Sequence, residues 1–276
     1  MGNPSAWPAL RPVFVPESNS LLVEMKGIGK AFPTSSGRPA WVVRDISLSV
    51  QEGEFLTIVG PSGSGKTTLL RLIAGIMMPS EGTVEFEGRL IGGPGSDRVM
   101  VFQSSEAALF EWLTVKQNVE FGLRSLGMPR EPRALRSTAV LDLVGLSPHA
   151  RKFPSQLSGG MQQRLQIARA IAVQPKLLLM DEPLAALDAQ TRRILLKELV
   201  RLWKETQSTF IYVTHDIREA VLLGGRIVVV SSGPSACIRT VLVNESPYPR
   251  DEFGQDFMAL FRAIDDQLAA EVGEQL

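Results

Sequence analysis

The chain of 276 residues contains a single cysteine, two histidines and two tyrosines. Because Cys237 has no partner in the chain, an internal disulfide is excluded, which is typical of proteins in a reducing compartment. No apolar run reaches the ~18 residues that a membrane-spanning helix needs, and the first residues lack the basic and then apolar layout of a secretory signal. We therefore expect a soluble protein that reaches a membrane only through a partner.

Charge is balanced, since 29 basic and 29 acidic residues give a formal net charge of zero. A basic face is not indicated, so nucleic acid is not an expected partner. The two histidines, His149 and His215, are too few for a histidine and cysteine metal cluster, and no nucleophile–histidine–acid set is evident. We expect His149, which follows Pro148 in a polar turn, to be exposed.

A phosphate-binding loop is predicted at residues 60–67. Its residues are Gly60, Pro61, Ser62, Gly63, Ser64, Gly65, Lys66 and Thr67, which fit the P-loop pattern. An apolar run precedes the loop and helical spacing follows it, which argues against a chance match in a glycine-rich turn. The glycines let successive N–H groups surround phosphate oxygens. Lys66 is predicted to bind the β- and γ-phosphates and Thr67 to bind Mg²⁺, and Thr68 is included in the nucleotide-binding set.

Strand and helix patterns alternate along the chain. Strands are predicted at 42–50, 55–59, 99–102, 177–180, 210–213 and 227–230, and helices around 160–173 and 188–205. The glycine-rich segment 82–96 predicts hairpins and loops, and the segment 106–165 has helical character, with Thr114 as a helix cap. This alternation predicts an α/β fold with a mostly parallel sheet, into which the helical block is inserted.

Polar or glycine residues follow four of the predicted strands. They are Gly60, Gln103, Asp181 and His215. Ligands of parallel α/β sheets bind beyond the carboxyl ends of the strands, so we expect these residues to converge on one phosphate site. Asp181 is the candidate to hold Mg²⁺, and Glu182 is placed to polarise an attacking water.

A second candidate anion site begins the helix predicted at 160–173. Ser158 is the expected N-cap, and Gly159 and Gly160 follow in the first turn, where glycine weakens a helix. The two glycines are explained if this helix start approaches an anion closely. An ordinary capped helix is the alternative.

Six motifs, taken in the order in which they occur between residue 22 and about residue 235, resemble those of the ATP-binding subunit of an ABC transporter. They are the Walker A loop 60–67, the Q-loop residue Gln103, the signature 157–160, the Walker B strand 177–181 with Glu182, the D-loop 185–188 and the switch residue His215. The resemblance implies a P-loop NTPase fold with a RecA-like, mostly parallel sheet core, an N-terminal antiparallel β subdomain and an inserted α-helical subdomain.

The resemblance also implies roles for the matched residues. The chain and a second copy of itself, or a paralogue, would form a head-to-tail dimer that binds two molecules of ATP. Ser158, Gly159 and Gly160 would then contact the γ-phosphate held by Lys66 of the other subunit. Glu182 would act as general base, His215 would hold the γ-phosphate and the water, and Asp188 would link the two sites. Gln103 would sense Mg²⁺ and the water, which places it with Thr67 and Asp181 in the metal set and with Lys66, Glu182 and His215 in the catalytic set. Phe32 matches the aromatic residue that stacks on adenine, with Trp41 as a rival.

Finer features resemble one branch of the family, the importers of nitrate, sulfonate, taurine and bicarbonate. These features are the segments 94–103, 112–119 and 202–206. The resemblance implies transmembrane permease subunits as partners, an indirect role for a substrate-binding protein, and a place on the cytoplasmic side of the inner membrane. Segment 104–111 is more acidic and polar than in that branch, which leaves the identity of the membrane partner open.

Three alternatives remain from the sequence. A soluble ABC ATPase acting on DNA or ribosomes is disfavoured by the lack of a long coiled-coil insertion, of a second cassette and of basic character. An ABC subunit for another small-molecule cargo fits the same motifs. A regulatory module that holds ATP without hydrolysing it is disfavoured by the complete catalytic set.

The ends of the chain are expected to differ from the ATPase domain, which we assign to 21–235. The proline-containing segment 1–20 is predicted to be a disordered leader. The extension 236–276 is predicted to contain an amphipathic helix, whose apolar residues are Phe253, Phe257, Leu260, Phe261, Ile264 and Leu268. This helix packs on the core of its own chain or takes part in dimer or partner contacts.

Overall fold

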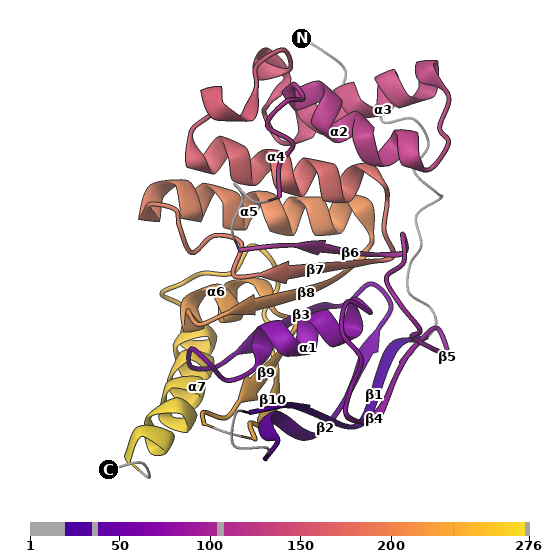
Figure 1. The fold of residues 1–276 in the computed structure, drawn as a ribbon. Helices are drawn as coiled ribbons and strands as arrows, with labels where there is room; N and C mark the ends of the chain where they lie inside the picture. Colours follow the sequence, from indigo (N-terminus) through magenta and orange to yellow (C-terminus); the bar gives the residue numbers. More distant parts are fainter. Residues whose placement is uncertain (1–19, 35–37, 104–107, 234, 274–276) are drawn as a thin grey trace.

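The computed structural model describes residues 20–34, 38–103, 108–233 and 235–273. The leader predicted for 1–20 therefore lies outside the described residues, apart from Ser20. Two sheets and the helices around them make up this part of the chain (Figure 1).

The larger sheet has six strands in the order β10-β9-β3-β8-β7-β6. The strands are β3 (Phe55–Val59), β6 (Arg98–Val101), β7 (Leu177–Asp181), β8 (Thr209–Thr214), β9 (Arg226–Val230) and β10 (Ile238–Val243). Within the described sheet β10 runs antiparallel to β9, and all other pairs are parallel. The predicted mostly parallel sheet is confirmed, with each predicted strand of this sheet within one residue of the observed bounds.

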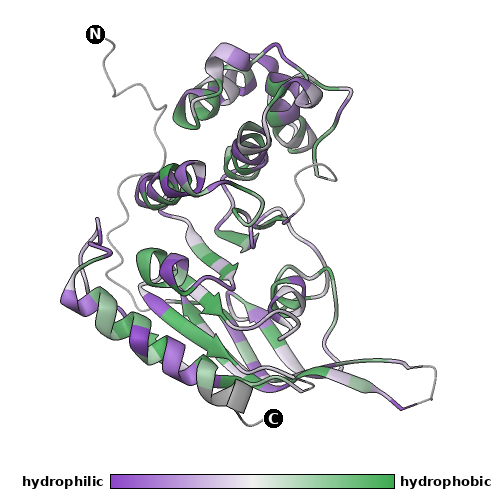
Figure 2. Ribbon diagram, turned by 90° about the vertical axis from the view of Figure 1, so that its left-hand side faces the viewer, coloured by the Kyte–Doolittle hydropathy of each residue, from purple (hydrophilic) through white to green (hydrophobic). Residues whose placement is uncertain are grey.

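Helices and the second sheet cover both faces of this sheet. Along β3, Phe55 belongs to the core formed with α4 (Gly159–Ala172) and α5 (Ala189–Thr206). Leu56 and Ile58 belong to the core formed with α1 (Lys66–Ile73) and the second sheet. Burial on both faces explains why these strands are apolar along their length, as Figure 2 shows for the central strands.

The second sheet is antiparallel and has the order β2-β1-β4-β5. Its strands are β1 (Leu21–Phe32), β2 (Ala40–Gln51), β4 (Glu81–Phe86) and β5 (Arg89–Leu90). Glu87 and Gly88 have φ angles of 50° and 72°, which is the two-residue turn of a type I′ hairpin. The hairpin predicted within 82–96 and the implied N-terminal antiparallel subdomain are both observed.

The inserted block contains α2 (Val115–Ser125), α3 (Arg130–Leu143), the short helices η1 (Ser147–His149) and η2 (Pro154–Gln156), and the start of α4. Thr114 caps α2 as predicted, because its hydroxyl accepts from Gln117 N at 3.3 Å and its N–H donates to Gln117 Oε1 at 2.9 Å. Residues 108–114 ahead of α2 form turns. His149, expected to be exposed, is half-buried in η1.

The C-terminal part of the chain contains α6 (Ile217–Leu223) and α7 (Gln255–Gly273). Phe257 and Ile264 of α7 are buried with residues of α6 and β9, so this helix packs on the core of its own chain. Phe253 precedes the helix and is 82% exposed, so its assignment to the apolar face was wrong. No helix in the described part of the chain combines the length and apolar character that crossing a membrane requires.

Candidate functional site

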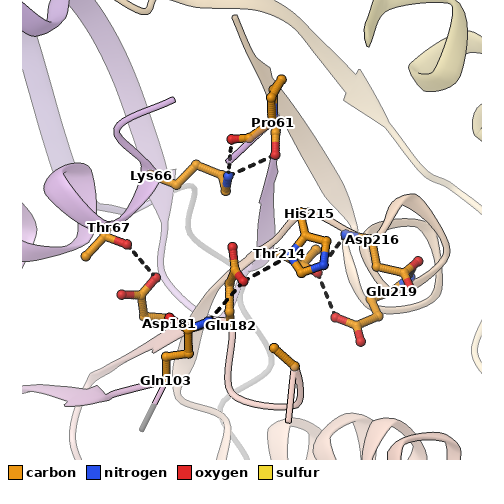
Figure 3. Close-up of polar contacts among 12 residues, drawn as sticks. Pro61, Lys66, Thr67, Gln103, Asp181, Glu182, Thr214, His215, Asp216 and Glu219 are labelled. Atoms are coloured by element: carbon orange, nitrogen blue, oxygen red, sulfur yellow. Dashed lines mark hydrogen bonds and ion pairs between the residues drawn. The ribbon is translucent and has the colours of Figure 1, made fainter. Parts of the chain in front are cut away.

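The residues that follow β3, β6, β7 and β8 meet at one edge of the central sheet. The parallel pairing of these strands places their carboxyl ends together. Figure 3 shows that Lys66, Thr67, Gln103, Asp181, Glu182 and His215 gather there. The predicted convergence of the four strand ends is therefore observed.

The ammonium group of Lys66, the first residue of α1, lies within the predicted phosphate-binding loop. Its ammonium donates to the carbonyl oxygens of Gly60 at 2.8 Å and Pro61 at 2.7 Å, and to Ser64 Oγ at 3.4 Å. Burial lowers the pKa of Lys66, while the nearby carboxylates of Glu182 and Asp181 oppose this shift. The loop thus holds a positive charge beside the start of α1.

Gly65 shows why this loop requires glycine. Its φ is 78°, in the left-handed region, and a Cβ there would lie 2.5 Å from Val43 Cγ1. Helix α1 starts directly after it with no side-chain hydrogen bond to cap it. Since the N–H groups of the first helical turn have no partner within a helix, they can bind an anion. The loop and Lys66 therefore fit a phosphate chain.

Thr67 and Asp181 provide a second part of the site. The Thr67 hydroxyl donates to Asp181 Oδ1 at 3.0 Å. Burial raises the pKa of Asp181, with the charge of Glu182 adding to the shift, and the Thr67 hydrogen bond and the charges of Arg71 and Lys66 opposing it. Hydroxyl and carboxylate oxygens are the ligands that Mg²⁺ prefers. Within the described residues no group of three or more His, Cys, Asp and Glu side chains that could hold a metal ion is found.

Glu182 connects the ends of β6 and β8. Its backbone has a positive φ of 43°, and its N–H donates to Val213 O at 3.0 Å. Its Oε2 lies 2.9 Å from Nδ1 of His215 and accepts from Gln103 Nε2 at 3.4 Å. His215 is 53% exposed. One carboxylate oxygen thus carries both contacts, next to the Thr67–Asp181 pair (Figure 3).

The two glycines at the start of α4 have different surroundings. Ser158 caps the helix as predicted, accepting from Met161 N at 3.4 Å. A Cβ on Gly159 would meet nothing within 4 Å, whereas one on Gly160 would lie 2.9 Å from Thr191 Cγ2 of α5. Packing within the chain therefore explains Gly160, while Gly159 leaves an open approach to the helix start.

Asp188 and Phe32 occupy positions that fit their predicted roles without testing them. Asp188 caps α5 by accepting from Thr191 N at 3.0 Å, and this hydrogen bond lowers the pKa of its carboxyl. Phe32 ends β1 and is 37% exposed. The rival Trp41 packs over Gly29, where a Cβ would lie 2.8 Å from the indole, and Arg44 lies 4.8 Å from its ring. Lys30 Nζ likewise lies over the Phe32 ring, 5.4 Å from its centroid, so a cation faces both rings, and Phe32 stays a prediction.

Sequence reasoning missed a group of residues behind His215, centred on Glu219 and Arg192. Glu219 is buried and accepts from the hydroxyls of Tyr212 and Thr214 at 2.8 and 2.7 Å. The spacing of Asp216 and Glu219 at the start of α6 is typical of a helix N-terminus and could have drawn attention to it. The residues of β8 and α5 that complete the group carry no comparable signal.

Comparisons with known proteins identify the family. The sequence model of the family "ABC transporter" matches residues 43–185. The bicarbonate transport ATP-binding protein CmpC of Synechococcus elongatus is 45% identical over 233 residues, which is 84% of this chain and 35% of that protein. The nitrate import ATP-binding protein NrtD of Synechocystis is 43% identical over 230 residues, covering 83% of this chain and 84% of that protein. The taurine import ATP-binding protein TauB of Jannaschia is 43% identical over 210 residues, covering 76% and 78%.

Comparison with solved structures identifies the same family. The dimeric ATP-binding cassette MJ0796, bound to ADP and phosphate, matches with a TM-score of 0.71 and 31% identity, covering 82% of this chain and 100% of that one. The cbiO1 protein from Clostridium perfringens, part of the transporter complex cbiONQ, matches with a TM-score of 0.73 and 26% identity, covering 91% and 97%. This chain spans only about a third of the length of CmpC. Since the family model covers half of the chain and the relatives cover most of it, the chain belongs to the ABC transporter family and contains its ATP-binding cassette.

Proposed function

We propose that this chain hydrolyses ATP as the energising subunit of an ABC importer for a small anion such as nitrate, sulfonate, taurine or bicarbonate. The observation that carries the proposal is the position of Glu182, held by His215 and Gln103 beside the Thr67–Asp181 pair. The names of the bicarbonate, nitrate and taurine relatives favour this group of cargoes.

The site supports hydrolysis by positioning and charge. Lys66 and the first-turn N–H groups of α1 would bind the β- and γ-phosphates. Thr67 and Asp181, with Gln103 nearby, would hold Mg²⁺, which neutralises phosphate charge when bound. Glu182 would orient the water and accept its proton, and His215 would hold Glu182 in place and contact the γ-phosphate.

Completion of the site by a second subunit accords with the open start of α4. Ser158, Gly159 and Gly160 would contact the γ-phosphate held by the other subunit, Asp188 would link the two sites, and Phe32 would stack on adenine. The dimeric form of the MJ0796 cassette supports this arrangement. Binding of ATP would close the dimer and hydrolysis would reopen it, so that a partner can use the shift between two states.

An apolar surface on the inserted helical block supports attachment to a membrane partner. The ring centroids of Phe110 and Phe121 lie 4.3 Å apart, and those of Phe110 and Trp112 lie 5.4 Å apart. Trp112 is 73% exposed. Transmembrane permease subunits would bind this side, at the cytoplasmic face of the inner membrane, and a substrate-binding protein would act through them.

The proposal is tested by purifying the tagged chain from gently solubilised membranes and identifying co-purifying proteins by mass spectrometry. A stoichiometric multi-span protein together with ATP hydrolysis by the complex is expected. A preparation that carries ribosomes or nucleic acid and no membrane protein would instead support the soluble alternative.

A further inference from the structure

Strand β8, which leads to His215, is linked to helix α6 by hydrogen bonds to one buried carboxylate. Glu219 is 5% exposed, and its Oε2 accepts from Tyr212 Oη at 2.8 Å and from Thr214 Oγ1 at 2.7 Å. Thr214 Oγ1 in turn accepts from Asp216 N at 3.0 Å. The residues on both sides of His215 are therefore fixed by a chain of hydrogen bonds that begins at Glu219 (Figure 3).

The second oxygen of Glu219 faces a different element. Arg192, in the first turn of α5, has its Nε 3.6 Å from Glu219 Oε1 and its Nη1 3.8 Å from Asp216 Oδ2. The same guanidinium donates through Nη2 to the carbonyl oxygens of Leu187 at 3.0 Å and Ala185 at 3.4 Å. These two carbonyl groups belong to the D-loop, which we define as residues 185–188.

We propose that Arg192 and Glu219 are positioning residues that couple the D-loop to His215. The proposal rests on the proposed function, since His215 matters as a residue of the hydrolysis site. Neither side chain contacts Lys66, Thr67, Asp181 or Glu182 in the described interactions, so both would act through the segments that they hold.

Geometry explains why coupling follows. The guanidinium is a planar fork with fixed donor directions, so a shift of the D-loop carbonyl groups must be followed by Arg192 or break its contacts. Arg192 reaches Glu219 and Asp216 through ion pairs at 3.6 and 3.8 Å rather than hydrogen bonds. A displacement of Arg192 would move the charge that these two carboxylates face and, through Thr214, would change how His215 faces Glu182. A movement at the D-loop would thereby reach the 2.9 Å contact between His215 and Glu182.

Substitutions can separate the two halves of the connection. Glu219→Gln keeps an oxygen for Tyr212 and Thr214 but turns an amide N–H₂ toward the Arg192 guanidinium, which has no acceptor. Arg192→Met removes the contacts to both the D-loop and α6. Arg193→Met is the matched control, because the neighbouring Arg193 pairs at 3.6 Å with Glu252 of the C-terminal segment and is 65% exposed.

The first readout is hydrogen–deuterium exchange of the full chain, which requires no turnover. We expect Glu219→Gln to raise exchange in peptides covering 183–191, across the bridge, and Arg192→Met to raise it in peptides covering 213–220. Arg193→Met should change neither. Increased exchange confined to the segment that contains the substitution would overturn the proposal.

The second readout is steady-state ATP hydrolysis. Displacing catalytic groups without removing them is expected to lower kcat by ~10- to 100-fold, while KM stays within about twofold. The double variant Arg192→Met with Glu219→Gln should be no slower than the slower single variant, because both break one connection. A kcat within about twofold of the unmodified chain in both single variants would overturn the coupling. Absence of hydrolysis in the unmodified chain would refute the proposed function instead, while the exchange experiment would still decide whether the coupling exists.

Discussion

His215 Nδ1 lies 2.9 Å from Glu182 Oε2, although the two residues follow different strands. The contact depends on the backbone of Glu182, whose φ of 43° turns the chain at the end of β7 while its N–H still bonds to β8. Two strands that are distant in sequence thus bring an acid and an imidazole to the place where the phosphate loop ends.

Replacement of Lys66 tests the phosphate loop. Lys66→Ala removes the ammonium that Gly60 and Pro61 hold in the loop, so we expect weaker binding of a fluorescent ATP analogue and a fall in turnover of at least ~100-fold. Lys197→Ala, which changes an exposed lysine of α5, should alter neither. Equal affinity of Lys66→Ala and the unmodified chain would exclude Lys66 as a phosphate ligand.

Asp181 is predicted to reduce stability while serving the site. Its pKa is raised by burial, so the folded chain binds a proton more tightly than the unfolded chain. The free energy of unfolding therefore falls as the pH rises through the unfolded and then the folded pKa of this group. We expect Asp181→Asn to raise Tm at pH 7.5 and to abolish Mg²⁺-dependent turnover.

The pH dependence provides the check. The Tm advantage of Asp181→Asn should shrink as the pH is lowered toward the ordinary pKa of an aspartate, where the carboxyl of the unmodified chain is protonated in both states. An advantage that is constant between neutral and acidic pH would show that burial of the charge is not its cause.

Substitutions of Gly160 and Gly159 test the two different roles expected of the glycines at the start of α4. A Cβ at Gly160 would lie 2.9 Å from Thr191 Cγ2, so Gly160→Ala should cost ~1–3 kcal/mol of unfolding free energy. Adding Thr191→Ser removes that methyl group and should restore most of the loss. Gly159→Ala, made in open space, should leave urea unfolding unchanged or slightly improved, yet lower turnover if a second subunit's nucleotide binds there. No recovery in the double variant would contradict the packing explanation.

Arg250 is predicted to stabilise the end of α6. Its Nη1 donates to the carbonyl oxygens of Val221 at 2.9 Å, Leu222 at 3.0 Å and Gly224 at 2.8 Å. Because the last carbonyl groups of a helix lack partners within it, Arg250→Met should lower the free energy of unfolding by ~2–3 kcal/mol. Arg262→Met, on the exposed side of α7, is the control. Equal urea midpoints for the two variants would rule out this role.

Much of the nucleotide site could be predicted from the sequence. The loop 60–67 carries a local pattern, and the apolar strands before Asp181 and His215 determine where their side chains emerge. If these strands are parallel neighbours their ends meet, so the convergence of Gln103, Asp181 and His215 follows from the strand pattern, whereas the roles of these residues came from the resemblance. The antiparallel subdomain could be predicted mainly from the resemblance to the family. Bulges and shifts of register interrupt the pairing of β1 with β2, so these strands lack a regular alternating pattern in the sequence.

The remaining features depend on contacts between distant residues. The bridge from Arg192 to Glu219 joins two helices. The spacing of Asp216 and Glu219 marks the start of α6, but nothing local indicates that Arg192 of α5 would pair with it. The close approach of Gly160 to Thr191 is set by the packing of α4 on α5. Phe253 was assigned to the apolar face of α7 because its spacing fits, but the helix begins after it.

The most direct test of hydrolysis at this site is the turnover of Glu182→Gln, measured together with the oligomeric state in the presence of Mg²⁺ and ATP. Loss of the proposed general base should lower kcat by ~10²- to 10⁴-fold while ATP still binds. An ATP-bound dimer should then accumulate and be detected by size-exclusion chromatography with light scattering. Full turnover by Glu182→Gln, with no accumulation of dimer, would contradict the role of Glu182 and the arrangement built around it.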